Sequence, residues 1–211
     1  MNITLLSIIS PILMDHSPAF VGNHLNIIKA KFSYFYPLLF YNQQTLLLKA
    51  SKFSKGLSGI IHYNGGNNQE LIYNQSFNDI NFQNDFISIV SKAKNQSVTI
   101  ADCSFIKITK PQNEGSPILI KGNDNNISVY MTDNIFQACY SLQGVIALKK
   151  CRCVTMTHIC SYESTCESQY AFLFNNCVPG DFSIFVYNTI VNSKQNNNND
   201  AYNINCNSGN Q

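Results

Sequence analysis

The chain has 211 residues, of which 45% are hydrophobic and only 12% are charged, and its formal net charge is +2 at pH 7. Ordinary globular domains carry about 25% charged residues. The few cations are scattered along the sequence, so composition gives no support to nucleic-acid or anionic-membrane binding. No stretch reaches the ~18 consecutive apolar residues of a membrane span.

Residues 1–22 form a separate N-terminal segment. The run from Ile3 to Met14 is apolar and of signal-peptide length, and Ser17-Pro18-Ala19 supplies the small residues that a cleavage site requires. However, no Lys or Arg precedes the run, and Pro11 interrupts it. Two interpretations stay open: a cleaved signal peptide, or an N-terminal strand that caps the rest of the fold.

Two patterns alternate over residues 23–193. The longer one reads apolar-x-apolar-x-polar-x-x-apolar, as at Val98, Ile100, Asp102 and Phe105, and the shorter one places two apolar residues around one other residue. Both have period two, which predicts strands with one buried face. The longer pattern aligns as Leu25/Ile27/Phe32, Leu46/Leu48/Phe53, Ile72/Asn74/Phe77, Val98/Ile100/Asp102/Phe105, Val129/Met131/Asp133/Phe136, Val154/Met156/His158/Ser161 and Ile184/Val186/Asn188/Val191. The shorter pattern aligns as Leu38/Phe40, Ile60/His62, Ile87/Ile89, Ile118/Ile120, Ile146/Leu148 and Phe172/Phe174.

The same residue class at the same place in each unit predicts an all-β parallel solenoid, whose coils stack one inter-strand spacing, ~4.8 Å, apart. A β-sandwich is the structural alternative, but it predicts hairpins without this equivalence. We expect one domain of about six to seven coils over residues 23–193. Residues 194–211 are Asn-rich and are predicted to be a disordered tail.

The string around Ile100, Asp102, Cys103 and Phe105, with its echo at Met131, Asp133 and Phe136, resembles the coil repeat of right-handed parallel β-helix proteins. That group includes pectin-lyase-like proteins and repeat-rich surface proteins of bacteria and protists. The resemblance implies a single-stranded right-handed β-helix. It also implies a stack of polar side chains that hydrogen-bond to the backbone at one bend.

A polar ladder is the first candidate site. Its members occupy one register in five coils: Asn74, Asp102, Asp133, His158 and Asn188. In the structural interpretation they support the bend. In the catalytic alternative, Asp102 and Asp133 are paired carboxylates with His158 above them, an arrangement used in glycoside hydrolysis.

Cysteines are the second candidate. Cys151 and Cys177 each follow a short-pattern strand by three residues, which predicts that they stack as buried thiols or, alternatively, form a disulfide. A zinc site fits poorly, since the spacing around Cys151, Cys153, His158 and Cys160 differs from known ligand patterns. We therefore expect no metal and no cofactor. His62 occupies an apolar short-pattern position and is expected to be a core residue.

The expected outer face beside the ladder carries hydroxyl groups and tyrosine but neither an arginine nor a carboxylate, which argues against pectate-lyase-type chemistry. The sequence therefore favours a non-enzymatic secreted or surface-displayed binding or scaffold protein. Its expected partners are a glycan or a cell-surface molecule, together with end-to-end self-association through open coil ends. The alternatives are a polysaccharide lyase or glycoside hydrolase and a truncated fragment without independent function.

Overall fold

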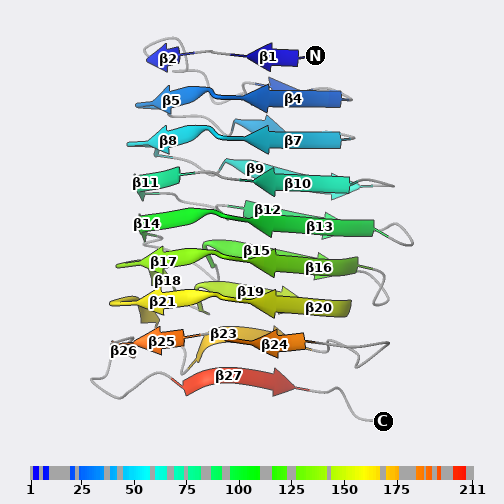
Figure 1. Ribbon diagram of the computed structural model, residues 1–211, viewed down its shortest axis with the longest axis vertical. Helices are drawn as coiled ribbons and strands as arrows, with labels where there is room; N and C mark the ends of the chain where they lie inside the picture. The colour runs from blue at the N-terminus through cyan, green and yellow to red at the C-terminus, as the bar shows by residue number, and fades with distance from the viewer. Residues whose placement is uncertain are drawn as a thin grey trace.

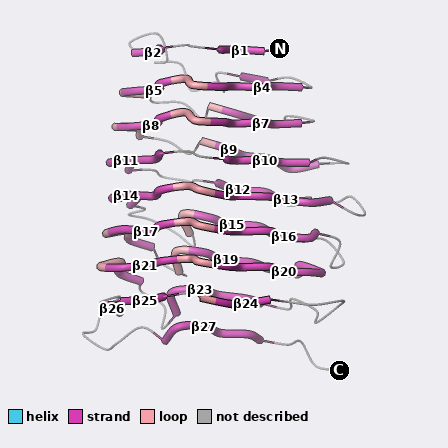
Figure 2. Tube along the Cα trace, in the orientation of Figure 1, coloured by secondary structure: helices cyan, strands magenta, loops and turns pink. Residues whose placement is uncertain are grey.

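The computed structural model shows an all-β protein built from three parallel sheets (Figure 1). It describes residues 2–4, 7–9, 20–21, 24–35, 39–41, 45–57, 60–65, 69–73, 76–81, 87–91, 96–109, 116–122, 127–141, 144–166, 170–175, 184–187, 189–191, 194–195 and 202–207. Within these ranges all regular structure is strand and no helix occurs (Figure 2).

The three sheets are here named A, B and C. Sheet A contains, in spatial order, β1 (Asn2–Thr4), β4 (His24–Ile28), β7 (Thr45–Lys49), β10 (Gln69–Tyr73), β13 (Gln96–Ala101), β16 (Ile127–Thr132), β20 (Cys151–Thr157) and β24 (Ile184–Val186). Sheet B contains β2 (Ser7–Ile9), β5 (Lys31–Ser33), β8 (Lys52–Ser54), β11 (Ser76–Asn81), β14 (Ser104–Thr109), β17 (Ile135–Gln137), β21 (Cys160–Tyr162) and β25 (Thr189–Val191). A branch of sheet B adds β18 (Tyr140–Ser141), β22 (Thr165–Cys166) and β26 (Lys194–Gln195). Sheet C contains β3 (Phe20–Val21), β6 (Phe40–Tyr41), β9 (Ile61–Gly65), β12 (Ile87–Ser91), β15 (Ile118–Gly122), β19 (Ile146–Lys149), β23 (Tyr170–Asn175) and β27 (Tyr202–Asn207).

The chain visits the sheets in rotation. After β4 in sheet A it enters β5 in sheet B and β6 in sheet C, and it returns to sheet A with β7. One passage through the three sheets is called a round below. Each strand pairs in parallel with its counterpart in the next round, as β13 does with β16 and β16 with β20. The prediction of an all-β chain of mostly parallel strands is confirmed, and the described strands form none of the hairpins that a sandwich requires.

Alternating side chains explain why these segments are strands with one buried face. Along β16, Ile127, Val129 and Met131 are buried while Ser128 and Tyr130 point outward. The inward residues of successive rounds then lie in line, as Ile100, Met131 and Met156 do in sheet A. Burying each such side chain contributes about 1.5–3 kcal/mol to folding. These columns form one continuous apolar core.

Phenylalanines form a core column on sheet B. Phe32 and Phe53 stack with ring centroids 4.9 Å apart and an interplanar angle of 2°. Phe105 and Phe136 stack in the same way, at 4.6 Å and 4°. The column ends at Ser161, which pairs with Phe136 and is buried with an unpartnered hydroxyl.

Two bends depend on residues in the left-handed region of backbone conformation. Between sheets A and B, φ is positive at Lys29, Ala50, Asp102, Asp133, His158 and Tyr187. A second bend, two residues beyond the phenylalanine column, has positive φ at Tyr34, Lys55, Lys107, Ala138 and Glu163. A left-handed residue reverses the usual strand alternation, so the residue that follows it points inward. Gly56 follows Lys55 there, and a Cβ at this position would collide with the buried Phe35 ring of the neighbouring round, so this one round requires glycine.

Three of the predicted alignments are displaced. In sheet C, Phe40 pairs with Ile61 and Ile61 pairs with Ile87, so Ile60/His62 is displaced by one residue and Leu38/Phe40, whose Leu38 lies outside the described residues, by two. In sheet A, Met156 pairs with Phe185 rather than with Val186. A one-residue slip exchanges the two faces of a strand, and adjacent apolar residues such as Ile60 and Ile61 leave the choice open in the sequence.

Strands also occur in both end segments. Strands β1, β2 and β3 lie within residues 1–22 and pair with β4, β5 and β6. Strand β27 lies in the segment predicted to be a disordered tail, where it pairs with β23. The sequence alternates there, since Tyr202, Ile204 and Cys206 are separated by single asparagines, and this alternation is typical of a strand. The proposed boundaries at residues 22 and 193 stay predictions.

We predict that Phe136→Ala lowers the free energy of unfolding by about 3–5 kcal/mol, because it leaves a cavity in the stacked phenylalanine column. Ile135→Ala is the matched control, since Ile135 is the preceding residue of the same strand and is 43% exposed. Its expected cost is within about 0.5 kcal/mol. Urea denaturation of both variants measures the difference, and equal losses would contradict the assigned register.

Candidate functional site

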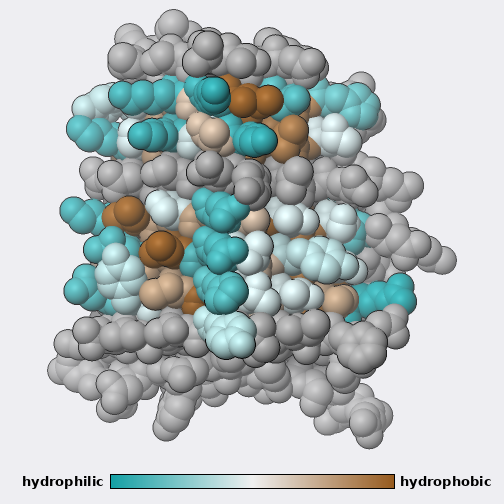
Figure 3. All heavy atoms as spheres, viewed as in Figure 1, coloured by the Kyte–Doolittle hydropathy of each residue, from teal (hydrophilic) through white to brown (hydrophobic). Residues whose placement is uncertain are grey.

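Polar side chains form a surface column at the bend between sheets A and B. Asp102, Asp133 and His158 each follow a sheet A strand, each has a φ of 53° or 54°, and each is exposed. Their backbones are held from round to round, since the amide of Asp102 donates to the carbonyl of Thr132 at 3.0 Å and that of Asp133 to Thr157 at 3.1 Å. Figure 3 shows hydrophilic side chains gathered in a column over this bend. These three ladder residues are therefore brought together, but on the surface.

Asp133 is at the centre of the contacts in this column. Its Oδ1 lies 3.3 Å from Nδ1 of His158. Its Oδ2 accepts a hydrogen bond from the Thr132 hydroxyl at 2.8 Å, and the Thr157 hydroxyl donates to that of Thr132 at 3.0 Å. Carboxylate, imidazole and two hydroxyls thus form one connected network on the outside of sheet A.

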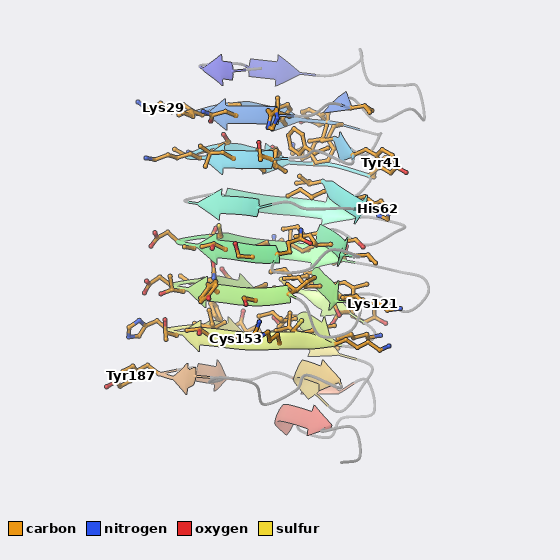
Figure 4. All side chains as sticks on the ribbon, turned by 90° about the vertical axis from the view of Figure 1, so that its right-hand side faces the viewer. Lys29, Tyr41, His62, Lys121, Cys153 and Tyr187 are labelled. Atoms are coloured by element: carbon orange, nitrogen blue, oxygen red, sulfur yellow. The ribbon has the colours of Figure 1, made fainter. Side chains whose placement is uncertain are left out.

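Tyr187 is the next member of the column. Thr157 pairs with Val186, so His158 is level with Tyr187 and not with Asn188. The rings of His158 and Tyr187 stack with centroids 5.2 Å apart, and Tyr187 is 78% exposed (Figure 4). Asn188 lies outside the described residues, as does Asn74. The assignment of Asn188 to this column is corrected by the register, because the last alignment of the longer pattern is displaced by one.

The polar column is open to solvent. The side chains of His158 and Asp133 are 56% and 53% exposed. An exposed ion pair contributes little energy, since water and salt screen it. Electrostatic catalysis gains its strength in sites from which water is excluded. The network nonetheless presents hydrogen-bond donors, acceptors and an aromatic face to a ligand from outside.

The polar residues that support the bend lie one position later than the sequence predicts. They are Ser51, Cys103 and Asn134, each of which follows a left-handed residue and is buried. Asn134 accepts a hydrogen bond from the Cys103 amide at 3.0 Å and donates to the Ile100 carbonyl at 2.8 Å. Ser51 accepts from the Ala30 amide at 3.0 Å and donates to the Lys49 carbonyl at 3.1 Å. The backbone-supporting role expected for Asp102 and Asp133 thus belongs to their neighbours.

A small or amide-bearing residue directly after the left-handed position of the bend is the signal that would have found this row. It occurs as Ala50-Ser51, Asp102-Cys103 and Asp133-Asn134. The second bend repeats the arrangement, because Cys139 is buried there and its amide donates to the Ser164 hydroxyl at 3.3 Å. Small polar side chains are therefore used to satisfy buried backbone groups at both bends.

Cysteines occupy structural positions. Cys103, Cys139 and Cys151 are buried and Cys153 and Cys160 are half-buried, all as thiols. The Cys151 thiol contacts the carbonyls of Lys149 and Ile120 at 3.7 and 3.9 Å. Cys177, its predicted stacking partner, lies outside the described residues, so the stack or disulfide of Cys151 with Cys177 stays a prediction.

The outer face of sheet A is rich in hydroxyl groups. Thr99, Tyr130 and Thr155 lie side by side on β13, β16 and β20, and Ser97 and Ser128 form the row before them. Tyr130 is 43% exposed. Together with the network at the adjoining bend, these residues make a continuous surface of hydroxyls and aromatic rings, which we call the sheet A face.

His62 lies outside the core. It pairs with Tyr41 and Ser88 in sheet C and is half-buried, with its ring stacked on Tyr41 at 5.6 Å (Figure 4). The expectation of a core histidine is wrong because the buried residue of this strand is Ile61, which is in register with the buried Ile87, so His62 falls on the alternate position.

The described residues contain no group of three or more His, Cys, Asp or Glu side chains that could hold a metal ion. They likewise include no helix with the length and hydrophobicity needed to cross a membrane. Comparison of the chain with protein-family models, with curated proteins and with solved structures gave no match.

We predict that Asn134→Ala lowers the free energy of unfolding by about 2–4 kcal/mol, because it leaves a buried amide and a buried carbonyl of the preceding round unpaired. Asp133→Asn is the matched control at the neighbouring exposed position, where asparagine tolerates the left-handed conformation, and its cost is expected to be within about 0.5 kcal/mol. Thermal and urea unfolding measure both. A larger loss of stability for the Asp133 variant than for the Asn134 variant would show that the exposed column supports the bend.

Proposed function

We propose that this chain is a single right-handed parallel β-helix that acts as a non-enzymatic binding module, secreted or displayed on a cell surface, and that the sheet A face contacts glycans. The rotation of the chain through three parallel sheets supports the β-helix. The composition of the sheet A face supports the glycan.

The observation that carries the proposal is the position of Tyr130 among hydroxyl side chains. It lies between Thr99 and Thr155 on neighbouring strands, and the residue is 43% exposed. An exposed aromatic ring offers a flat apolar surface to the C–H groups of a sugar, while adjacent hydroxyls exchange hydrogen bonds with sugar hydroxyls. Tyrosine also offers such contact area at a low cost in conformational entropy.

The network at the edge of the sheet A face extends this surface. The Thr157 hydroxyl donates to that of Thr132, which donates to Asp133, and the Asp133 carboxylate lies 3.3 Å from Nδ1 of His158, so a ligand would meet these groups already in contact with one another. Preorganised polar groups lose less conformational freedom on binding, which favours affinity.

The contact between Asp133 and His158 also favours a second candidate, a polysaccharide lyase or glycoside hydrolase that uses Asp102, Asp133 and His158. Paired acid and base groups are needed for either reaction. We rank this candidate second because the two side chains are more than half exposed.

We predict that Tyr130→Ala weakens glycan binding about tenfold, as expected for the loss of a central tyrosine from an interface. The protein would first be screened on an array of neutral and acidic glycans, and its affinity for each retained glycan would then be measured by calorimetry.

Tyr34→Ala provides the matched control. Tyr34 is also an exposed tyrosine, at 54%, but it lies at the second bend, away from the sheet A face. Its replacement should leave affinity within about twofold, as for most residues outside an interface hot spot. Failure of the folded protein to bind any glycan would reject the proposal.

A further inference from the structure

An exposed apolar side chain lies beside the polar column at the bend between sheets A and B. Asp133 and Ile135 flank the buried Asn134, and both are exposed, Asp133 at the bend and Ile135 at the start of β17. Two residues of chain span at most about 7 Å, so the Cα atoms of Asp133 and Ile135 lie no farther apart than this. A carboxylate and an aliphatic side chain are thus presented together on one surface.

The neighbours of Ile135 on sheet B are also partly apolar. Ile135 pairs with Ser104 on β14 and with Cys160 on β21, and Ile106 pairs with Gln137 in the next outward row. Ile135 is 43% exposed, whereas Ile106 and Cys160 are half-buried. Figure 3 shows hydrophobic side chains over sheet B, directly beside the hydrophilic column. We call Ile106, Ile135 and Cys160 the apolar patch.

The carboxylate of Asp133 can accept further hydrogen bonds. A carboxylate has about four acceptor sites on its two oxygens. Oδ1 lies 3.3 Å from Nδ1 of His158, and Oδ2 accepts from the Thr132 hydroxyl at 2.8 Å. The Asp133 side chain is also 53% exposed, so an N–H group of a ligand can reach it from solvent.

One round of the chain carries the surface from sheet A to sheet B. In chain order it presents Tyr130 and Thr132 on β16, Asp133 at the bend and Ile135 on β17. A ligand that lies along this round therefore meets an aromatic ring, a hydroxyl, a carboxylate and an aliphatic side chain in that order. The apolar patch is in this way continuous with the sheet A face.

The size and charge of this surface restrict its occupant. A stable protein partner needs about 800 Å² on each side, whereas the exposed member of the apolar patch is the single side chain of Ile135. A small apolar group on a polar ligand fits it better. Asp102 and Asp133 place carboxylates at this bend in neighbouring rounds, which disfavours an anionic sugar.

We propose that Asp133 and the apolar patch bind the acetamido group of an N-acetylated sugar whose ring lies on the sheet A face. This inference deepens the function proposed above and rests on it. The acetamido N–H donates a hydrogen bond to the Asp133 carboxylate, and the acetamido methyl group packs against Ile135. A sugar hydroxyl or amine at the same position supplies the donor without the methyl group, so the two contacts together select the acetylated sugar.

The test uses three hexasaccharides that share a β-1,4-linked backbone and differ at one substituent of each ring. They are cellohexaose, the glucosamine hexamer and the N-acetylglucosamine hexamer, and affinities for the unaltered protein are measured by calorimetry. The acetylated hexamer should bind about tenfold more tightly than cellohexaose, as expected for one hydrogen bond to a charged group and one buried methyl. The cationic glucosamine hexamer controls for simple attraction to carboxylates, and it should bind more weakly than the acetylated hexamer.

Two variants test the two contacts separately. In Ile135→Ala, the preference for the acetylated hexamer over cellohexaose should fall about fourfold, because a methyl contact is lost. In Asp133→Asn, the same preference should fall about fivefold, because a neutral amide oxygen is a weaker acceptor than a carboxylate. Thermal unfolding verifies that both variants remain folded.

Leu57→Ala provides the matched control. Leu57 is an exposed aliphatic residue, at 55%, and its replacement removes the same number of carbon atoms as Ile135→Ala. It follows Gly56 in the round of β7 and β8, away from the apolar patch. The preference for the acetylated hexamer should stay within about twofold of that of the unaltered protein, as for most residues outside an interface hot spot.

The outcomes separate this inference from the function on which it rests. Binding of none of the three hexamers would overturn the inference, as would equal losses in Ile135→Ala and Leu57→Ala. Tighter binding of the glucosamine hexamer would assign recognition to charge and would also overturn it.

Tyr130→Ala distinguishes the two proposals. If all three hexamers bind equally and Tyr130→Ala weakens them all, the function proposed above stands and the acetamido contact fails. If the preference depends on Ile135 and Asp133 but affinity is unchanged by Tyr130→Ala, the acetamido contact stands and the role of Tyr130 fails.

Discussion

The structure depends on one constraint, which is that equivalent side chains of successive rounds must lie in line inside the core. Parallel pairing fixes the register of each strand with the next, and any slip by one residue would move an entire inward row to the surface. The stacked rings of Phe105 and Phe136 show how closely the constraint is met, since their planes differ by only 4°. Because the core is a set of continuous columns, each round supports the register of its neighbours.

The left-handed residues at the bends decide which side chains are available for function. In a continuous strand, the residue after an inward side chain would point outward and the next inward again. At the bend between sheets A and B, Asp133 adopts a positive φ and is exposed, and Asn134 beside it is fully buried. Adjacent polar residues are thereby divided between two roles. Asn134 satisfies the backbone of the preceding round, and Asp133 joins His158 on the surface.

This division of neighbouring residues between the surface and the core also explains where polar and aromatic side chains lie on the molecule. At the bends, buried polar side chains such as Ser51 and Asn134 are hydrogen-bonded to backbone, so they stabilise the bends without offering a reactive site. Hydroxyls, aromatic rings and charges are placed outside, where strands of neighbouring rounds bring them into rows. An extended ligand is the natural partner of such rows, because it can contact several rounds at once.

Much of the architecture followed from the sequence alone. The period-two patterns determined the strands, and their repetition determined the parallel pairing, because only stacked rounds place Ile100, Met131 and Met156 in equivalent positions. The sequence also determined that Phe136 belongs to an inward column and Tyr130 to the outer face. These properties are local in origin, since alternation along a strand is fixed by backbone geometry.

Tertiary structure decided the rest, for the reason that a bend or a bulge breaks this alternation. The sequence could not show that Asp133 is exposed and Asn134 buried, since that depends on one φ angle. Nor could it show whether Ile60 or Ile61 is level with Ile87, or whether Tyr187 or Asn188 is level with His158, because neighbouring residues fit the pattern equally well. Cations that look scattered in the sequence come together because Lys121 and Lys149 lie on adjacent strands of sheet C, and only the pairing of those strands makes them neighbours.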